Sequence, residues 1–124
     1  QNITYKCCSN FLIHLCGCNA IDANKSLVAL LTDNNNAASN TLGLLKNTGT
    51  NYSPNVSVQI TDSSGSPLPI APKVIGSSSS FFNFGTIGTG GTVSKSFKAR
   101  YYSNAIPVPA TGVYAQATIT LIYN

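Results

Sequence analysis

The chain has 124 residues, enough for one domain with a single core. The chain has seven Lys and Arg residues and three Asp residues, and only 8% of its residues are charged, against about 25% in an average soluble domain. This weak, scattered positive charge argues against a nucleic-acid binder. Ser, Thr and Asn supply 41 residues, and a surface of hydroxyl and amide groups disfavours a helical protein. No apolar run approaches the length of about 20 residues that a membrane-spanning helix needs.

Short segments of alternating hydrophobicity predict β-strands along the chain. In chain order these predicted strands are Phe11–Leu15, Ser26–Leu31, Thr41–Leu45, Val56–Ile60 and Phe81–Ile87. Asn34–Asn36 is predicted to be a loop, and Asp62–Gly65 a tight turn. The segment Leu68–Ile75 contains prolines, so it is expected to be an edge strand or irregular.

The two clearest strand patterns lie near the C-terminus. In Val93–Tyr102 the residues predicted to face inward are Val93, Phe97, Ala99 and Tyr101, whereas Tyr102 belongs to the outward set. In Val113–Tyr123 the alternation continues for eleven residues, and the predicted inward set is Val113, Ala115, Ala117, Ile119, Leu121 and Tyr123. A period of two indicates half-buried strands, and many short strands separated by turns predict an all-β sandwich. We find no internal repeat or linker and expect one domain over residues 1–124.

Four cysteines lie close together in the sequence, at Cys7, Cys8, Cys16 and Cys18. An even number in a small polar domain indicates disulfides and an oxidising compartment. Zinc is the weaker alternative, because one adjacent pair and one Cys-x-Cys pair do not match the usual ligand spacing. A Cys16–His14 nucleophile is weaker still, and the chain lacks the motifs of nucleophilic, metal and phosphate sites. We therefore expect no enzyme, no metal and no cofactor.

Four segments in the right order resemble the subunits of chaperone–usher fimbriae of the type 1 and P pilus kind. They are Phe11–Cys18, then Gly43–Thr48 with Asn55–Gly65, then Phe97–Tyr102, and last Gly112–Asn124 with its penultimate Tyr. The resemblance implies an incomplete immunoglobulin-like sandwich that lacks its last strand. A periplasmic chaperone would lend this strand during secretion through an outer-membrane usher. In the fibre, the N-terminal extension of a neighbouring subunit would replace it, as strand addition to a free edge.

The same resemblance implies which residues meet the donated strand. The groove would be lined by the inward residues of the last two predicted strands: Val113, Ala115, Ala117, Ile119, Leu121, Tyr123, Val93, Phe97, Ala99 and Tyr101. The expected partners are other pilin subunits, chaperone and usher, with a host glycan receptor at the fibre tip and no nucleic acid. The expected location is an extracellular fimbria reached through the periplasm.

A second hypothesis is the pilin-like domain of a tip adhesin, or another secreted glycan-binding sandwich. A lectin site would need aromatic and carboxylate side chains on loops, and Asp33 beside Asn34–Asn36 is the only sequence candidate.

Two features depart from the family pattern. Residues 1–10 are expected to form an atypical, apparently truncated segment, and Gln1–Lys6 is too short to fill a groove. Either a donor extension is missing from the sequence, or the domain accepts a strand without donating one. The family has one cysteine pair, and Cys18 matches its second member. Family position favours the nested pairing Cys7–Cys18 with Cys8–Cys16. One bridge between the two pairs is easy to form, whereas two at once need a twist or a bulge.

Overall fold

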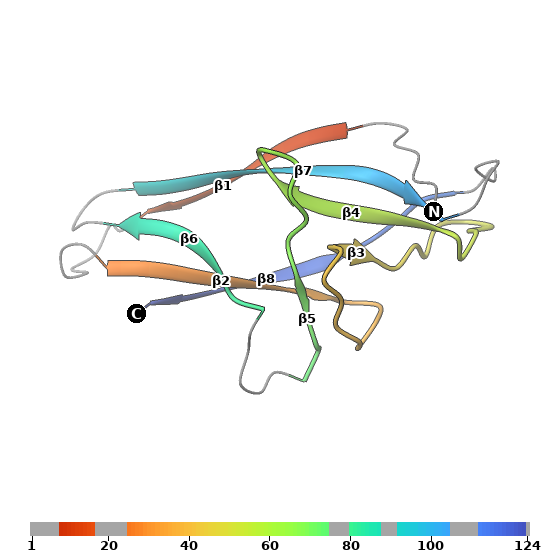
Figure 1. Cartoon of the computed structure of the whole chain (residues 1–124), viewed down its shortest axis with the longest axis horizontal. Helices are drawn as coiled ribbons and strands as arrows, with labels where there is room; N and C mark the ends of the chain where they lie inside the picture. Colours follow the sequence, from red (N-terminus) through yellow and green to blue (C-terminus); the bar gives the residue numbers. More distant parts are fainter. Residues whose placement is uncertain (1–7, 17–24, 75–79, 88–91, 105–111, 124) are drawn as a thin grey trace.

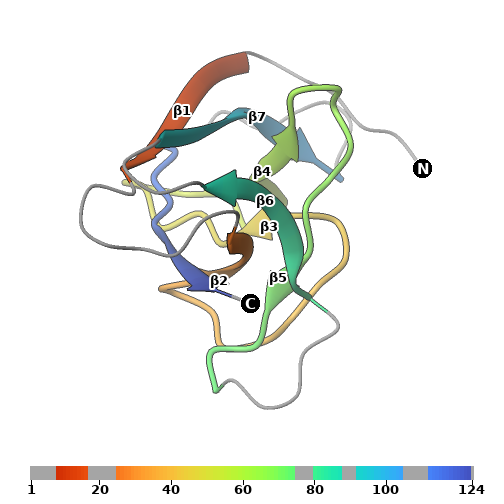
Figure 2. The same cartoon turned by 90° about the vertical axis from the view of Figure 1, so that its left-hand side faces the viewer.

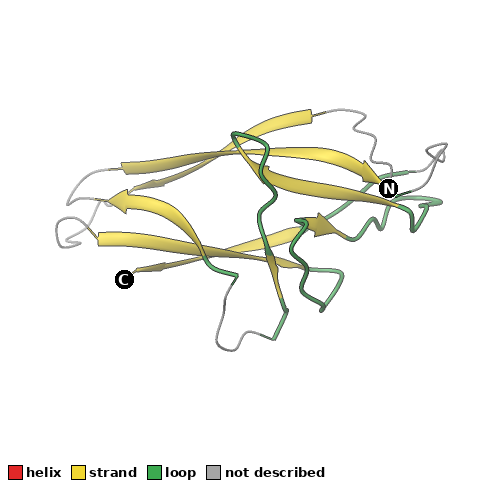
Figure 3. Cartoon of the chain, in the orientation of Figure 1, coloured by secondary structure: helices red, strands yellow, loops and turns green. Residues whose placement is uncertain are grey.

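Every regular element in the described part of the chain is a β-strand (Figure 3). The structure is a computed structural model, and it describes residues 8–16, 25–74, 80–87, 92–104 and 112–123. None of these residues forms a helix that could cross a membrane. The strands are β1 (Cys8–Cys16), β2 (Lys25–Asp33), β3 (Leu44–Leu45), β4 (Val56–Asp62), β5 (Ile70–Ala71), β6 (Phe82–Ile87), β7 (Thr92–Ser103) and β8 (Ala117–Tyr123).

The strands form two sheets packed face to face (Figure 1). The first sheet has the order β1-β7-β4-β3, with antiparallel neighbours throughout. In the second sheet β2 is central, with β8 antiparallel along one edge. Its other edge is shared by β6, which is antiparallel, and β5, which is parallel. The predicted all-β sandwich is confirmed.

Strands β1 and β8 are edge strands of different sheets, and they lie along the same side of the sandwich. Figure 2 shows β1 in red and β8 in blue along this side. Each has one ladder only, β1 with β7 and β8 with β2, and no ladder joins the two among the described strands. We call this the open side of the sandwich.

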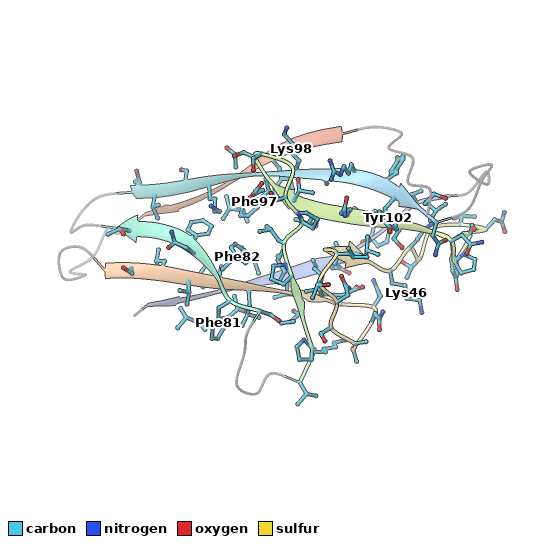
Figure 4. All side chains as sticks on the ribbon, in the orientation of Figure 1. Lys46, Phe81, Phe82, Phe97, Lys98 and Tyr102 are labelled. Atoms are coloured by element: carbon cyan, nitrogen blue, oxygen red, sulfur yellow. The ribbon has the colours of Figure 1, made fainter. Side chains whose placement is uncertain are left out.

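The core lies between the sheets and is centred on Phe97, which is 1% exposed. Its ring stacks on Phe11 of β1 at a centroid distance of 5.4 Å and meets the edge of Phe82 of β6 at 6.1 Å. Phe84 lies 6.4 Å away, so aromatic contacts connect β7 with both β1 and the opposite sheet. Figure 4 labels Phe97 and Phe82 of this cluster. The aliphatic residues of the same cluster are Leu27, Ala29, Leu31, Leu45, Ile60, Leu68 and Ile70.

Gly43 explains why β3 begins abruptly. Its φ of +71° is a conformation that side-chain-bearing residues rarely adopt. A Cβ there would lie 2.5 Å from the carbonyl oxygen of Ile60 and 2.9 Å from that of Leu68. The Gly43 carbonyl accepts the Ile60 N–H at 2.8 Å. The backbone therefore passes too close to β4 for any side chain, and β3 starts only after this point.

Three sequence expectations about strand faces and limits are corrected by the structure. The last strand begins at Ala117 rather than Val113, because β2 ends at Asp33, opposite Ala117, and offers no further ladder partner. Tyr102, predicted to face outward, is only 5% exposed. On that outer face Arg100 donates to the Gly65 carbonyl at 3.2 Å, so the turn after β4 covers part of the sheet. The predicted strand at 41–45 is reduced to two residues.

Candidate functional site

Among the described strands β8 pairs only with β2, so the backbone groups on its other edge face the open side without a described ladder partner. The Asn34 N–H donates to the Gln116 carbonyl at 3.0 Å, which makes these two residues a hydrogen-bonded pair in the β2–β8 register. Hydrogen-bonded and non-hydrogen-bonded pairs alternate along an antiparallel ladder, so the even-numbered residues of β8 form the backbone hydrogen bonds to β2. The N–H and C=O groups of Ile119 and Leu121 therefore point to the free edge.

The side chains of the same odd-numbered residues face the core from this edge. Ala115, Ile119 and Leu121 pack against the core cluster and are still partly exposed. Across the open side, Ile13 of β1 does the same. Phe11, which stacks on Phe97, is 38% exposed. Apolar side chains that belong to the core are thus reachable by solvent between β1 and β8.

The other residues predicted to line the groove differ in their burial. Phe97 is fully buried, and Val93 and Ala99 pack against the core cluster from β7 beneath the open side. Tyr101 and Val113 are half-buried, and neither belongs to the core cluster. Ala117 is exposed, although the alternation predicts it to face inward. Tyr123 is paired with Leu27 in the ladder, but its side chain lies outside the described part.

Sequence reasoning missed Asn47, which fixes the start of the β8 segment. This side chain is 2% exposed. Its Nδ2 donates to the Gly112 carbonyl at 2.8 Å, and its Oδ1 accepts the N–H groups of Gly49 at 2.9 Å and Tyr114 at 3.0 Å. In the sequence, Asn47-Thr-Gly49 indicates only a turn after the predicted strand Thr41–Leu45. Its long-range bonds leave no local signal.

Close backbone contact reinforces this junction between residues 47–50 and 112–114. The Thr48 N–H donates to the Tyr114 carbonyl at 2.8 Å, and the Gly112 N–H donates to the Thr50 carbonyl at 3.1 Å. A Cβ on Gly49 would lie 2.5 Å from the Gly112 carbonyl carbon, and one on Gly112 would overlap the Thr50 carbonyl oxygen. The two glycines allow the segment before β8 to be held by backbone bonds where β2 has ended.

Asp33, the sequence candidate for a lectin carboxylate, has a different role. It is 1% exposed at the end of β2. Its Oδ1 accepts the Asn35 N–H at 2.9 Å, and its Oδ2 accepts the Lys46 N–H at 2.7 Å. Both oxygens are thus engaged by backbone groups, and the carboxylate joins the loop after β2 to the residue after β3.

The structure contradicts one of the proposed cysteine pairings. Cys8 and Cys16 are the two ends of β1, which pairs with β7 without interruption. Eight steps of about 3.3 Å separate their Cα atoms by about 26 Å, whereas a disulfide joins Cα atoms at most about 7 Å apart. The Cys8–Cys16 pairing is therefore wrong. Cys7 and Cys18 lie outside the described residues, and the residues that the structure does describe hold no group of three His, Cys or Asp that could bind a metal.

Comparisons with known proteins agree with this architecture. The sequence model of one protein family, described as "Fimbrial protein", matches residues 2–124. No curated protein sequence matches the chain. Among solved structures, the chain is similar to the P pilus rod subunit PapA, with a TM-score of 0.55 and 15% sequence identity. The similarity covers 98% of this chain and 82% of that one, and at this identity it concerns the fold alone.

Proposed function

The chain belongs to the Fimbrial protein family, and we propose that it is a pilus subunit that accepts a β-strand from another chain between β1 and β8. The resemblance to fimbrial subunits predicted from the sequence is thereby confirmed. Proteins of this family are structural components of extracellular fibres and associate with other pilin subunits. Strand acceptance by this chain is the step that the proposal adds.

The single observation that carries the proposal is the β8 edge. There the backbone groups of Ile119 and Leu121 face outward in the plane of the sheet, and their side chains lie half-buried over the core. An added strand would pair with these groups, and its alternate apolar side chains would cover Ile119, Leu121 and Ile13. Main-chain hydrogen bonds then supply affinity, and the alternating side chains supply register. An uncovered edge of this kind is an aggregation hazard, which is a physical reason for a protein to keep it occupied.

Different strand donors would occupy the same edge one after the other. We propose that a periplasmic chaperone supplies the strand while an outer-membrane usher receives the subunit, and that a neighbouring pilin supplies it in the fibre. One acceptor edge serves both donors because backbone pairing is indifferent to most of the donor sequence. Only the alternate side chains that face the core must be apolar.

The proposal is tested by adding a strand to the purified chain. The probe is a synthetic peptide about as long as β8, with Val or Ile at alternate positions and Thr or Ser between them. We expect the amide protons of Ile119 and Leu121 to exchange about ten-fold more slowly with peptide, and those of Thr118 and Thr120 to change little, because β2 already protects them. A peptide of the same composition with its apolar residues in adjacent pairs is the control.

Two variants separate the open side from general effects on β8. Ile119→Asp places a carboxylate over the core and should abolish binding of the peptide. Thr118→Asp makes the same change on the outer, exposed face and should leave binding intact. Slow exchange of Ile119 and Leu121 without any added strand would mean that the chain covers this edge itself, and the proposal would then fail.

A further inference from the structure

A hollow of about 550 Å³ lies away from the open side, beside β3 and the loops around it. Its volume is within the range of small-molecule pockets. The polar side chains that line it are Asn36, Asn40, Lys46, Asn47, Tyr52 and Ser57. None of its described lining residues belongs to β1 or β8, and β3 is the edge of the first sheet opposite β1. The hollow therefore remains accessible in a chain whose open side is filled.

Two of the amides make the walls rigid. The Asn40 Nδ2 donates to the Leu44 carbonyl at 2.9 Å, and its Oδ1 accepts the N–H groups of Leu42 and Leu44 at 3.2 and 2.9 Å. Asn47 is held by the three bonds already described. Because these side chains are fixed by the backbone, the hollow needs little ordering when a ligand enters, and this preorganisation favours binding.

Other polar groups at the hollow have no partner within the described part of the chain. They are the Lys46 ammonium, the Asn36 Nδ2, the Tyr52 hydroxyl and the Ser57 hydroxyl. Figure 4 places Lys46 among the loops beside β3, at the end of the molecule away from the C-terminus. Acceptor oxygens and hydroxyls of a ligand could therefore form hydrogen bonds with these groups without breaking any bond of the fold.

The ligand class follows from charge and shape. Lys46 contributes a cation, and no acidic side chain is among the described lining residues, since Asp33 is buried and bonded to backbone. The Tyr52 ring is 45% exposed and offers a flat apolar surface with a polar tip. A pyranose ring complements this set when it carries one carboxylate, because it has an apolar C–H face and hydroxyls on its rim. We propose that the hollow binds an acidic saccharide, with Lys46 on the carboxylate and Tyr52 against the sugar ring.

The test is an NMR titration of the purified full chain with three probes. N-acetylneuraminic acid has both ring and carboxylate, N-acetylglucosamine has only the ring, and acetate has only the carboxylate. We expect saturable shifts confined to amides near residues 36–57 for the acidic sugar, with affinity about ten-fold weaker for each of the other two, because a charged hydrogen bond is among the stronger contacts. Equal binding of acetate would mean a bare anion site and would overturn the saccharide assignment.

Matched variants locate the ligand. Lys46→Gln should weaken binding of the acidic sugar about ten-fold and leave the neutral sugar unchanged, whereas Lys98→Gln on β7 removes the same charge elsewhere and should have no effect. Tyr52→Leu should weaken both sugars, and Tyr114→Leu, at another exposed tyrosine, neither. Three results would each overturn the proposal. They are an absence of saturable shifts, the same loss of affinity for the acidic sugar in Lys98→Gln as in Lys46→Gln, and tighter binding of an N-acetyl-aspartate peptide than of the acidic sugar. The peptide that supplies the added strand should not alter the titration, so this proposal and the proposed function fail independently.

Discussion

Replacement of Asn47 by Ala tests whether one amide holds the start of the β8 segment. The substitution removes one donor and one acceptor that together make three hydrogen bonds to Gly112, Gly49 and Tyr114. A typical hydrogen bond contributes about 1 kcal/mol net, and the side chain is 2% exposed, so water cannot easily replace it. We expect Asn47→Ala to lower the free energy of unfolding by about 3 kcal/mol. For a chain of this size that corresponds to a fall of about 10 °C in Tm.

The assay is urea and thermal unfolding followed by circular dichroism, with amide exchange of Tyr114 as the local measurement. Asn36→Ala is the matched control, because that exposed amide accepts only the Ala38 N–H at 3.1 Å and should cost less than about 1 kcal/mol. Asn47→Asp keeps both accepted bonds but turns a buried carboxylate oxygen toward the Gly112 carbonyl, so it should destabilise the fold at least as much as Asn47→Ala. Equal losses in Asn47→Ala and Asn36→Ala would refute the reasoning.

Three further outcomes are expected. Phe97→Leu should destabilise the fold by about 3 kcal/mol, because it removes three aromatic contacts in the core, whereas Phe81→Leu at a 39% exposed ring should cost under about 1 kcal/mol; urea unfolding measures both. The pKa of Asp62 is lowered first by a hydrogen bond from the Ser64 hydroxyl and then by the backbone N–H groups of Ser66 and Ser64. The ionised carboxylate therefore stabilises the fold above its unfolded pKa of 3.8, and this stabilisation is lost as pH falls through the folded pKa. The difference in Tm between wild type and Asp62→Asn should therefore shrink below about pH 4; a constant difference would contradict this. With only 8% charged residues, Tm should change little on going to about 1 M salt at neutral pH, and a large fall would count against a surface stabilised by neutral groups.

Local sequence patterns were sufficient for the fold class and for the faces of the longest strands. Alternation predicted that Val93, Phe97 and Ala99 face the core and that Ile119 and Leu121 do so from the last strand, and these five residues lie there. A period of two is a property of the extended backbone itself, so it can be read without knowing the partner strand. The prolines likewise predicted an edge strand or an irregular segment over Leu68–Ile75, and within it β5 pairs over two residues at the edge of its sheet.

The same patterns could not place strand ends or show what covers a face. Alternation begins at Val113, yet the ladder begins at Ala117 because β2 has already ended. Tyr102 alternates in the sequence with the polar residues of its strand, and its burial to 5% exposure is not visible in that alternation. The continuity of β1 also excluded the Cys8–Cys16 bridge, which nothing in the cysteine spacing could do.

The sequence by itself therefore determined that this chain is a β-sandwich with an alternating, half-buried last strand, because those properties repeat along a few adjacent residues. Only the tertiary structure decided the roles of Asn47 and Asp33 and the presence of the hollow at Lys46 and Tyr52. These features join residues 13 to 67 positions apart, as in the bonds from Lys46 to Asp33 and from Tyr114 to Asn47. Such contacts depend on how the two sheets and their loops pack, and the chain brings their partners together only when it folds.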